Sequence, residues 1–269
     1  MAPEGTRETE ELNSKPVSLG KKLENEGRTA YLSALRVFKT MNKSIFAILI
    51  VLFVATFISA NDLDHQVAAK KAFEAHGGEK LKSMRSLVVR GSAEISGSPQ
   101  VTFPATFSTI FSGDKYLLEI TNPFQPLRQV SDGNSTQSSL PGFSLPPVTR
   151  LGLPMLQRIG DEGFKVEPLP EKFKKRPGFR VVSPEGFYTD FLVDAKTGAI
   201  KSYESAFEID GRLVSTSVEV DRVRDVDGVK IPERYSQRLE LGQFTVYVTF
   251  RATEILVNSE MDTSIFNVR

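Results

Sequence analysis

Histidine, the side chain most often used for proton transfer and metal binding, occurs only twice in this sequence, as His65 and His76. The two lie eleven positions apart, so a helix would not place them on one face at the four-residue spacing of a metal pair. His76 precedes two glycines and is interpreted as a helix-end residue. Cysteine is absent, which excludes disulfides, thiolate metal sites and a thiol nucleophile. We therefore predict no catalytic residues, no metal site, no cofactor and no enzyme.

An acidic cluster near residue 225 faintly resembles a calcium-binding loop. It contains Asp221, Asp225 and Asp227, followed by Gly228. The spacing of the ligands is wrong for such a loop, and so is its terminal position, which should be glutamate. A hairpin turn at Asp227-Gly228 is the better interpretation, because this dipeptide favours tight turns between strands.

A short basic cluster follows the middle of the chain and consists of Lys172, Lys174, Lys175 and Arg176. A solvated loop is the ordinary interpretation, and contact with an anionic membrane surface is the more specific one. The net charge of the chain is only +1. Because nucleic-acid binders usually show a basic excess or stripe, we predict no nucleic-acid partner.

Apolar side chains offer a more specific candidate site. The sequence has 19 Phe and no Trp, and Phe rings need apolar surroundings. Residues 140–159 are rich in Pro, Leu and Gly, as is typical of a lid or binding loop. Either these side chains form a closed core, or they line a cavity for an apolar ligand under a helix over 147–159. We predict the cavity, lined by Phe103, Phe107, Phe111, Leu145, Val148, Leu151, Met155, Ile159, Phe207, Phe244 and Phe250.

The elements that must position these side chains are mostly strands. Apolar and polar residues alternate along 101–111, 199–209, 229–241 and 243–252, as expected of antiparallel strands with one buried face. Hairpin signals such as Gly113-Asp114 and Asp227-Gly228 separate them. A helix over 62–75 and a short helical turn over 79–84 come first. We predict about nine to eleven strands in one large antiparallel sheet or open barrel.

A segment upstream of the helix indicates export. Ser44–Asn61 carries no charge and contains the apolar run Ile45–Phe57. Read from Met41, it is a signal peptide cleaved before Asn61; read whole, it is a membrane anchor with its N-terminal side inside. A buried core helix is a third alternative.

The predicted domain organisation follows from this segment. It comprises an N-terminal extension at 1–43, which is untranslated if synthesis starts at Met41, a signal peptide or anchor at 44–60, and one β-rich domain at 61–269. We expect an exported, periplasmic protein, or a single-pass membrane protein with this domain outside the cytoplasm.

The order of several short motifs resembles the LolA/LolB-like lipoprotein-carrier superfamily. These are AHGG, EKLKSMRSLVVRGSAEI, VDGVKIPERY and ILVNSEMDTSIFNV, the last with Asn258, Met261-Asp262 and Ile265-Phe266. The resemblance covers about residues 62–269, and its motifs mark the boundaries of structural elements rather than chemically reactive groups. It implies an unclosed β-barrel around an apolar cavity that shelters acyl chains or hydrophobic peptides.

The predicted fold class is therefore α+β: a curved antiparallel sheet or unclosed β-barrel with an N-terminal helix and a central lid helix. The predicted function is a periplasmic carrier or sensor of a hydrophobic ligand, such as a lipid or lipoprotein acyl chains. The alternative is a membrane-anchored envelope module that binds protein rather than lipid.

Overall fold

The computed structural model describes residues 60–97, 101–173, 176–209, 211–242 and 244–268. These residues fall into one compact unit, Ser59–Arg269. The predicted N-terminal extension at 1–43 and the apolar segment at 44–60 lie outside the described residues, apart from residue 60 at the start of the first helix. No helix in the described stretches is long and apolar enough to cross a membrane.

The two predicted helical segments at the start of the domain are present. Helix α3 spans Ala60–Ala75, and the short helix α4 spans Glu79–Lys82. Gly77 and Gly78 separate them with positive φ angles of 123° and 53°. A Cβ atom on Gly77 would lie 2.7 Å from the carbonyl oxygen of Gly228. Glycine is thus required where the end of α3 meets a hairpin turn.

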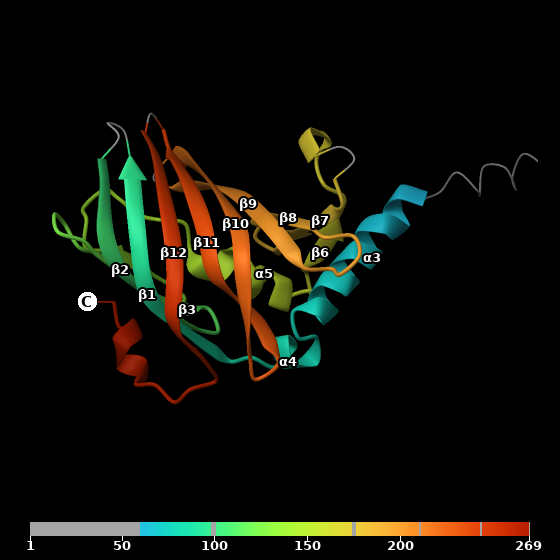
Figure 1. The fold of residues 1–269 in the computed structure, drawn as a ribbon, viewed down its shortest axis with the longest axis horizontal. Helices are drawn as coiled ribbons and strands as arrows, with labels where there is room; N and C mark the ends of the chain where they lie inside the picture. The colour runs from blue at the N-terminus through green and yellow to red at the C-terminus, as the bar shows by residue number, and fades with distance from the viewer. Residues whose placement is uncertain (1–59, 98–100, 174–175, 210, 243, 269) are drawn as a thin grey trace, which may run out of the picture. The chain divides into compact units, whose positions relative to one another are not determined.

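Twelve strands form one antiparallel sheet in the order β5-β4-β3-β2-β1-β12-β11-β10-β9-β8-β7-β6 (Figure 1). The sheet is open, with β5 and β6 at its edges, which confirms the predicted fold class. Its strands are β1 Ser86–Gly97, β2 Val101–Ser112, β3 Lys115–Thr121, β4 Leu127–Ser131, β5 Thr136–Ser138, β6 Lys165–Glu167, β7 Gly178–Val182, β8 Tyr188–Val193, β9 Ile200–Ile209, β10 Arg212–Val226, β11 Val229–Leu241 and β12 Phe244–Val257.

The sequence predicts the long strands better than the short ones. The hairpin signals Gly113-Asp114 and Asp227-Gly228 fall between β2 and β3 and between β10 and β11. The described part of the chain has twelve strands rather than nine to eleven. Edge strands β5 and β6 have three residues each, too few for alternation to be visible in the sequence.

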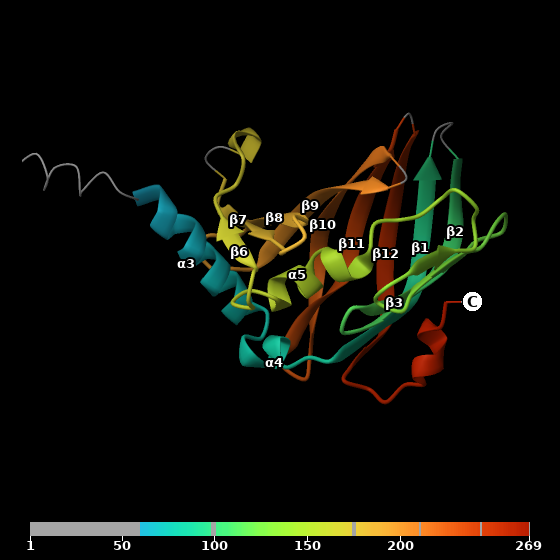
Figure 2. The ribbon, with the colours of Figure 1, turned by 180° about the vertical axis from the view of Figure 1, so that it is seen from behind.

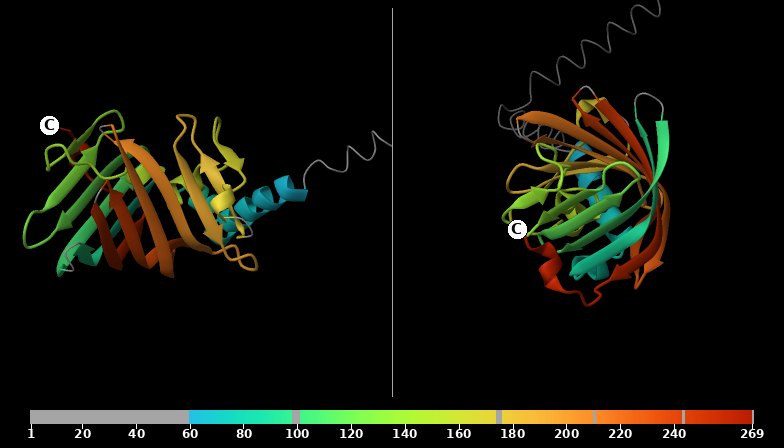
Figure 3. Two further views of the ribbon diagram at one scale, coloured as in Figure 1. Left: turned by 90° about the horizontal axis from the view of Figure 1, so that it is seen from above. Right: turned by 90° about the vertical axis from the view of Figure 1, so that its left-hand side faces the viewer.

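The sheet curls around one face, as the view along it shows (Figure 3). Register shifts interrupt the ladders between Arg90 and Gly91 on β1 and near Arg222 on β10. A Cβ atom on Gly91 would overlap the carbonyl oxygen of Arg251, so only glycine permits this close approach of β1 and β12. Such irregularities bend and twist a sheet and allow it to enclose a core.

The chain crosses the concave face between the two edge strands (Figure 2). Residues 139–164 join β5 to β6 and contain the 3-10 helix η1, Val148–Arg150, and helix α5, Leu153–Gln157. The predicted lid helix over 147–159 is therefore two short helices. Leu151 between them is extended, and Gly152 has φ +62°, which a continuous helix does not allow.

A small second core lies on the convex face. Phe266, on the 3-10 helix η3 at Thr263–Phe266, packs there with Val88, Ile110, Leu117 and Val130. The remaining short helix, η2 at Glu171–Phe173, lies between β6 and β7.

The C-terminal motif of the superfamily resemblance is structural in this chain. Asn258, at φ +54°, accepts a hydrogen bond at 2.7 Å from the Arg85 amide. Asp262 caps η3 by accepting one from Ser264. The motif thus fixes the start of β1 and the start of η3.

Candidate functional site

A cavity of about 150 Å³ lies between the concave face of the sheet and the segment that crosses it. We call residues 145–157 the lid segment. The sheet contributes inward-facing side chains from β1, β2, β3, β9, β10, β11 and β12, and the lid segment contributes Leu145, Pro146, Val148, Leu151, Leu153 and Pro154. Among the described residues, none of the lining side chains is charged. Such a site suits an apolar ligand.

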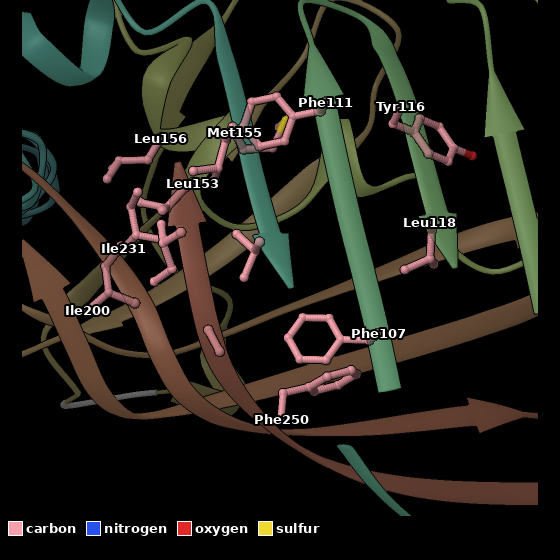
Figure 4. Close-up of a cluster of buried hydrophobic side chains, with 14 of the residues drawn as sticks. Phe107, Phe111, Tyr116, Leu118, Leu153, Met155, Leu156, Ile200, Ile231 and Phe250 are labelled. Carbon is pink, nitrogen blue, oxygen red and sulfur yellow. The ribbon is translucent and has the colours of Figure 1, made fainter. Parts of the chain in front are cut away.

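Five of the eleven predicted site residues line this cavity: Phe111, Leu145, Val148, Leu151 and Phe250. Phe107 does not line it but supports its wall, because its ring meets the ring of Phe250 edge-on at 4.9 Å (Figure 4). Phe250 is also stacked on Tyr235 at 4.7 Å. The alternation along β2 and β12 therefore places Phe111 and Phe250 on the face of the sheet that borders the cavity.

The other five predicted residues lie elsewhere. Met155 is only 1% exposed and belongs to the core around α5 (Figure 4), and Ile159 packs against the same core. Phe103 pairs with Phe124 at 5.2 Å, and Phe207 lies 6.1 Å from Phe187. Phe244, the first residue of β12, is 67% exposed.

Gln129 fixes the beginning of the lid segment. Its side chain is fully buried. The amide oxygen of Gln129 accepts a hydrogen bond from the Leu145 N–H at 2.7 Å, and its amide nitrogen donates to the Leu145 carbonyl at 2.9 Å. The same nitrogen donates to the Tyr116 hydroxyl at 2.8 Å. One side chain therefore satisfies both backbone groups of Leu145 inside an apolar core.

Lys82 and Gln157 fix the other end. The Lys82 ammonium donates to the carbonyls of Gln157 and Ile159 at 3.1 and 2.8 Å, and to the Asp161 carboxylate at 2.6 Å. Gln157 donates in return to the carbonyls of Lys82 and Met84. Desolvation opposes ionisation of Asp161, yet Lys82 and Arg158 together hold its pKa below the ordinary value. The lid segment is thus anchored at both ends.

Gly152 lets the middle of the lid segment approach the sheet. A Cβ atom there would lie 2.8 Å from the ring of Tyr203, so a larger residue would separate the two. The positive φ of Gly152 adds strain for other residues. Between its anchors, therefore, the segment contacts the sheet through a position that tolerates only glycine.

Four polar residues lie within this apolar lining: Thr109 on β2, Tyr203 on β9, and Tyr235 and Gln237 on β11. Burial raises the pKa of both phenols, and the neighbouring Tyr203 raises that of Tyr235 further. Both hydroxyls therefore stay protonated and can donate hydrogen bonds. The sequence places both tyrosines on inward faces, but a site predicted from apolar side chains alone omits them.

The basic cluster is only partly described, since Lys174 and Lys175 lie outside the described residues. Lys172 pairs with the Glu204 carboxylate and lies 4.8 Å from the Phe173 ring centroid. Arg176 is exposed. Part of the positive charge predicted to meet a membrane surface is thus already balanced within the chain.

The chemistry-bearing residues of the sequence are structural where they are described. His76 follows α3, and its Nδ1 lies 2.9 Å from the Ala72 carbonyl oxygen, which confirms the helix-end interpretation. Asp227 and Gly228 form the turn between β10 and β11, with Gly228 donating to Asp225 at 2.9 Å. Within the described stretches, no group of three His, Asp or Glu residues is arranged to hold a metal ion.

Comparisons with known proteins return structures rather than sequences. No family model matches the chain, and no curated protein matches it. Similar solved structures include a LolA superfamily protein from Nitrosomonas europaea, at 13% identity and TM-score 0.45, covering 73% of this chain and 97% of that one.

Two further structures are similar to a comparable extent. A DUF1329 family protein from Desulfovibrio piger has 9% identity, TM-score 0.43 and coverage of 76% and 97%. A putative outer membrane lipoprotein-sorting protein domain from Vibrio parahaemolyticus has 10% identity, TM-score 0.40 and coverage of 74% and 97%. The superfamily that the sequence resembles is thus represented among similar solved structures.

Proposed function

We propose that this protein binds an acyl chain, or an apolar ligand of similar shape, in the concave cavity, and that it carries or senses that ligand outside the cytoplasm. The observation that supports this most strongly is the lining: a largely apolar wall without a charged side chain among the described residues, beneath the lid segment. Placement outside the cytoplasm rests on the sequence of 44–60.

The size of the cavity limits how much of a ligand can enter without movement of the lid segment. A cavity of about 150 Å³ holds one small apolar molecule, on the scale of a benzene ring. A long acyl chain therefore requires the lid segment to move away from the sheet between its anchors. Each buried methylene contributes about 0.8 kcal/mol, so roughly six give about 5 kcal/mol before the entropic cost of association. Partial entry of a chain is thus enough for measurable binding.

Leu151→Asp tests the proposal. The change places a carboxylate in the cavity wall, and we expect it to weaken binding of a fluorescent acyl probe at least tenfold. Leu213→Asp is the matched control, because Leu213 is 70% exposed and lies outside the cavity. Circular dichroism checks that both variants fold.

Two results would refute the proposal. One is that the full-length wild type binds no acyl probe. The other is that folded Leu151→Asp binds the probe as tightly as Leu213→Asp. In either case the apolar side chains would form a closed core, and a protein-binding module would become the better account.

A further inference from the structure

Tyr203 and Tyr235 are half-buried residues that line the cavity. Within the described part of the chain, neither Tyr203 nor Tyr235 makes a side-chain hydrogen bond, whereas the buried Tyr116 hydroxyl accepts one from Gln129. A hydroxyl at a cavity wall loses its interaction with water when an apolar ligand covers it, so a ligand that accepts its hydrogen bond is favoured over one that does not. The two hydroxyls are available to such a ligand.

The strand register gathers these groups into one patch. Tyr203 is paired with Val218, and Val218 with Gln237, so Tyr203 and Gln237 lie in one row across β9, β10 and β11. Tyr235 is two residues before Gln237 on the same face of β11. Gln237 donates to the Thr216 hydroxyl at 2.9 Å, which orients its amide. The two phenols are the free donors of this patch.

The environment of the patch limits what can accept these hydrogen bonds. Both phenols are kept protonated by burial, so they act as donors. No cation lines the described cavity wall to neutralise an anion. A carboxylate there would be a buried, uncompensated charge, which is costly. A neutral carbonyl needs only donors.

We propose that Tyr203 and Tyr235 bind the carbonyl oxygen of a neutral acyl ester or amide, so that the protein selects acyl chains in linked form over free fatty acids. This inference rests on the proposed function and specifies its ligand. The acyl chain lies along the apolar wall toward Phe111 and Phe250, and the ester or amide carbonyl meets the hydroxyl pair.

The test compares three small ligands of similar length: methyl hexanoate, hexanoate and n-octane. Each displaces a neutral naphthylamine fluorophore from the full-length protein at pH 8. The Tyr203→Phe/Tyr235→Phe variant keeps both rings and removes both hydroxyls. Tyr247→Phe is the matched control, since Tyr247 is 53% exposed.

We expect the double variant to bind methyl hexanoate about tenfold more weakly than wild type, because two hydrogen bonds are lost. Affinity for n-octane should be unchanged or slightly higher, and Tyr247→Phe should match wild type for both ligands. The wild type should also prefer methyl hexanoate to hexanoate.

Other results would overturn the inference. If the double variant changes the affinity for ester and alkane equally, the hydroxyls serve only bound water or packing. If wild type prefers hexanoate, the cavity accepts a charged head. If wild type binds n-octane but shows no selective loss of the ester on mutation, the inference fails while the proposed function stands. If wild type binds none of the three ligands and no acyl probe, both fail.

Discussion

At the scale of single residues, Gln129 contributes more hydrogen bonds to the position of the lid segment than is usual for a glutamine. It is fully buried, and it bonds both backbone groups of Leu145 and the Tyr116 hydroxyl. A polar side chain is tolerated in this buried position because both its amide oxygen and its amide nitrogen have hydrogen-bond partners. Removing its amide would leave three buried polar groups without that partner.

Gln129→Met should therefore destabilise the protein by about 3 kcal/mol, since each unsatisfied buried group costs roughly 1–3 kcal/mol. Urea unfolding measures the change in free energy. Gln125→Met is the control: Gln125 is exposed, so its loss should stay within about 0.5 kcal/mol. Equal stability of the two variants would show that Gln129 does not anchor the lid segment.

His76 makes a different prediction, about pH. Burial lowers its pKa below the ordinary value of 6.5, the hydrogen bond with the Ala72 carbonyl partly opposes this, and the charge of Lys230 adds to it. The folded state therefore takes up a proton at His76 less readily than the unfolded state. Linkage then requires stability to be unaffected above pH 6.5 and to decline as the pH falls below it.

We expect the free energy of unfolding to decrease between pH 7 and pH 5, and His76→Gln to reduce that decrease. The carboxyl groups with lowered pKa values, such as Asp161 and Glu233, start from ordinary values of 3.8 and 4.5, so they act at lower pH. Denaturant titrations at several pH values provide the measurement. An unchanged slope in His76→Gln would contradict the assignment.

At the scale of elements, hydrogen bonds hold the lid segment at both ends. Gln129 holds its start, and Lys82 holds its end through two carbonyls and one carboxylate. The residues between them contact the sheet around Gly152 and Tyr203. Arg150 adds contacts in the middle, because its carbonyl accepts a hydrogen bond from Thr189 at 3.4 Å and its guanidinium lies 3.8 Å from the Phe187 ring centroid. Movement of the middle therefore requires these contacts to break, while the anchors hold the ends.

Lys82→Met tests the second anchor. Loss of its three hydrogen bonds should accelerate hydrogen exchange of amides in 153–161 about tenfold, with little change in the central strands. Lys70→Met is the matched control, because Lys70 is an exposed residue of α3. Hydrogen exchange of both variants is measured by mass spectrometry. Equal exchange rates in their 153–161 peptides would contradict the role of Lys82 as an anchor.

Alternation along the chain predicts the sheet, because each buried strand face leaves a period-two pattern. It selects Phe111 and Phe250 correctly as inward-facing. Alternation does not show how much of a strand's inward face the rest of the chain covers. The sequence therefore predicts Phe244 in the cavity, whereas the structure leaves it exposed.

The lid shows a second limit of the sequence. A continuous helix over 147–159 would place Val148, Leu151 and Met155 on one side. The break at Gly152 changes the direction of the following residues, so Leu151 lines the cavity and Met155 enters the core. A glycine at positive φ is visible only in the structure, although Gly-Leu-Pro in the sequence marks where a break is favoured.

At the scale of the whole described domain, the open sheet and the lid segment depend on each other. The segment joins the two edge strands, β5 and β6, and crosses the concave face between them (Figure 2). Because these edges are not paired with each other, the sheet does not close into a barrel with a fixed interior. The cavity volume is thus set by the position of the lid segment, as expected of a site that takes a chain-like ligand.

The central claim is that an acyl ligand lies in the concave cavity under residues 145–157. An acyl ester with a diazirine at the end of its chain tests this directly, by photolabelling of the full-length protein and mass-spectrometric mapping of the labelled peptides. The account predicts labels in 145–151 and on the inward faces of β11 and β12, which unlabelled ester should compete away and Leu151→Asp should abolish. Labels confined to α3 or to the convex face near η3, or labels that excess ester does not reduce, would contradict it.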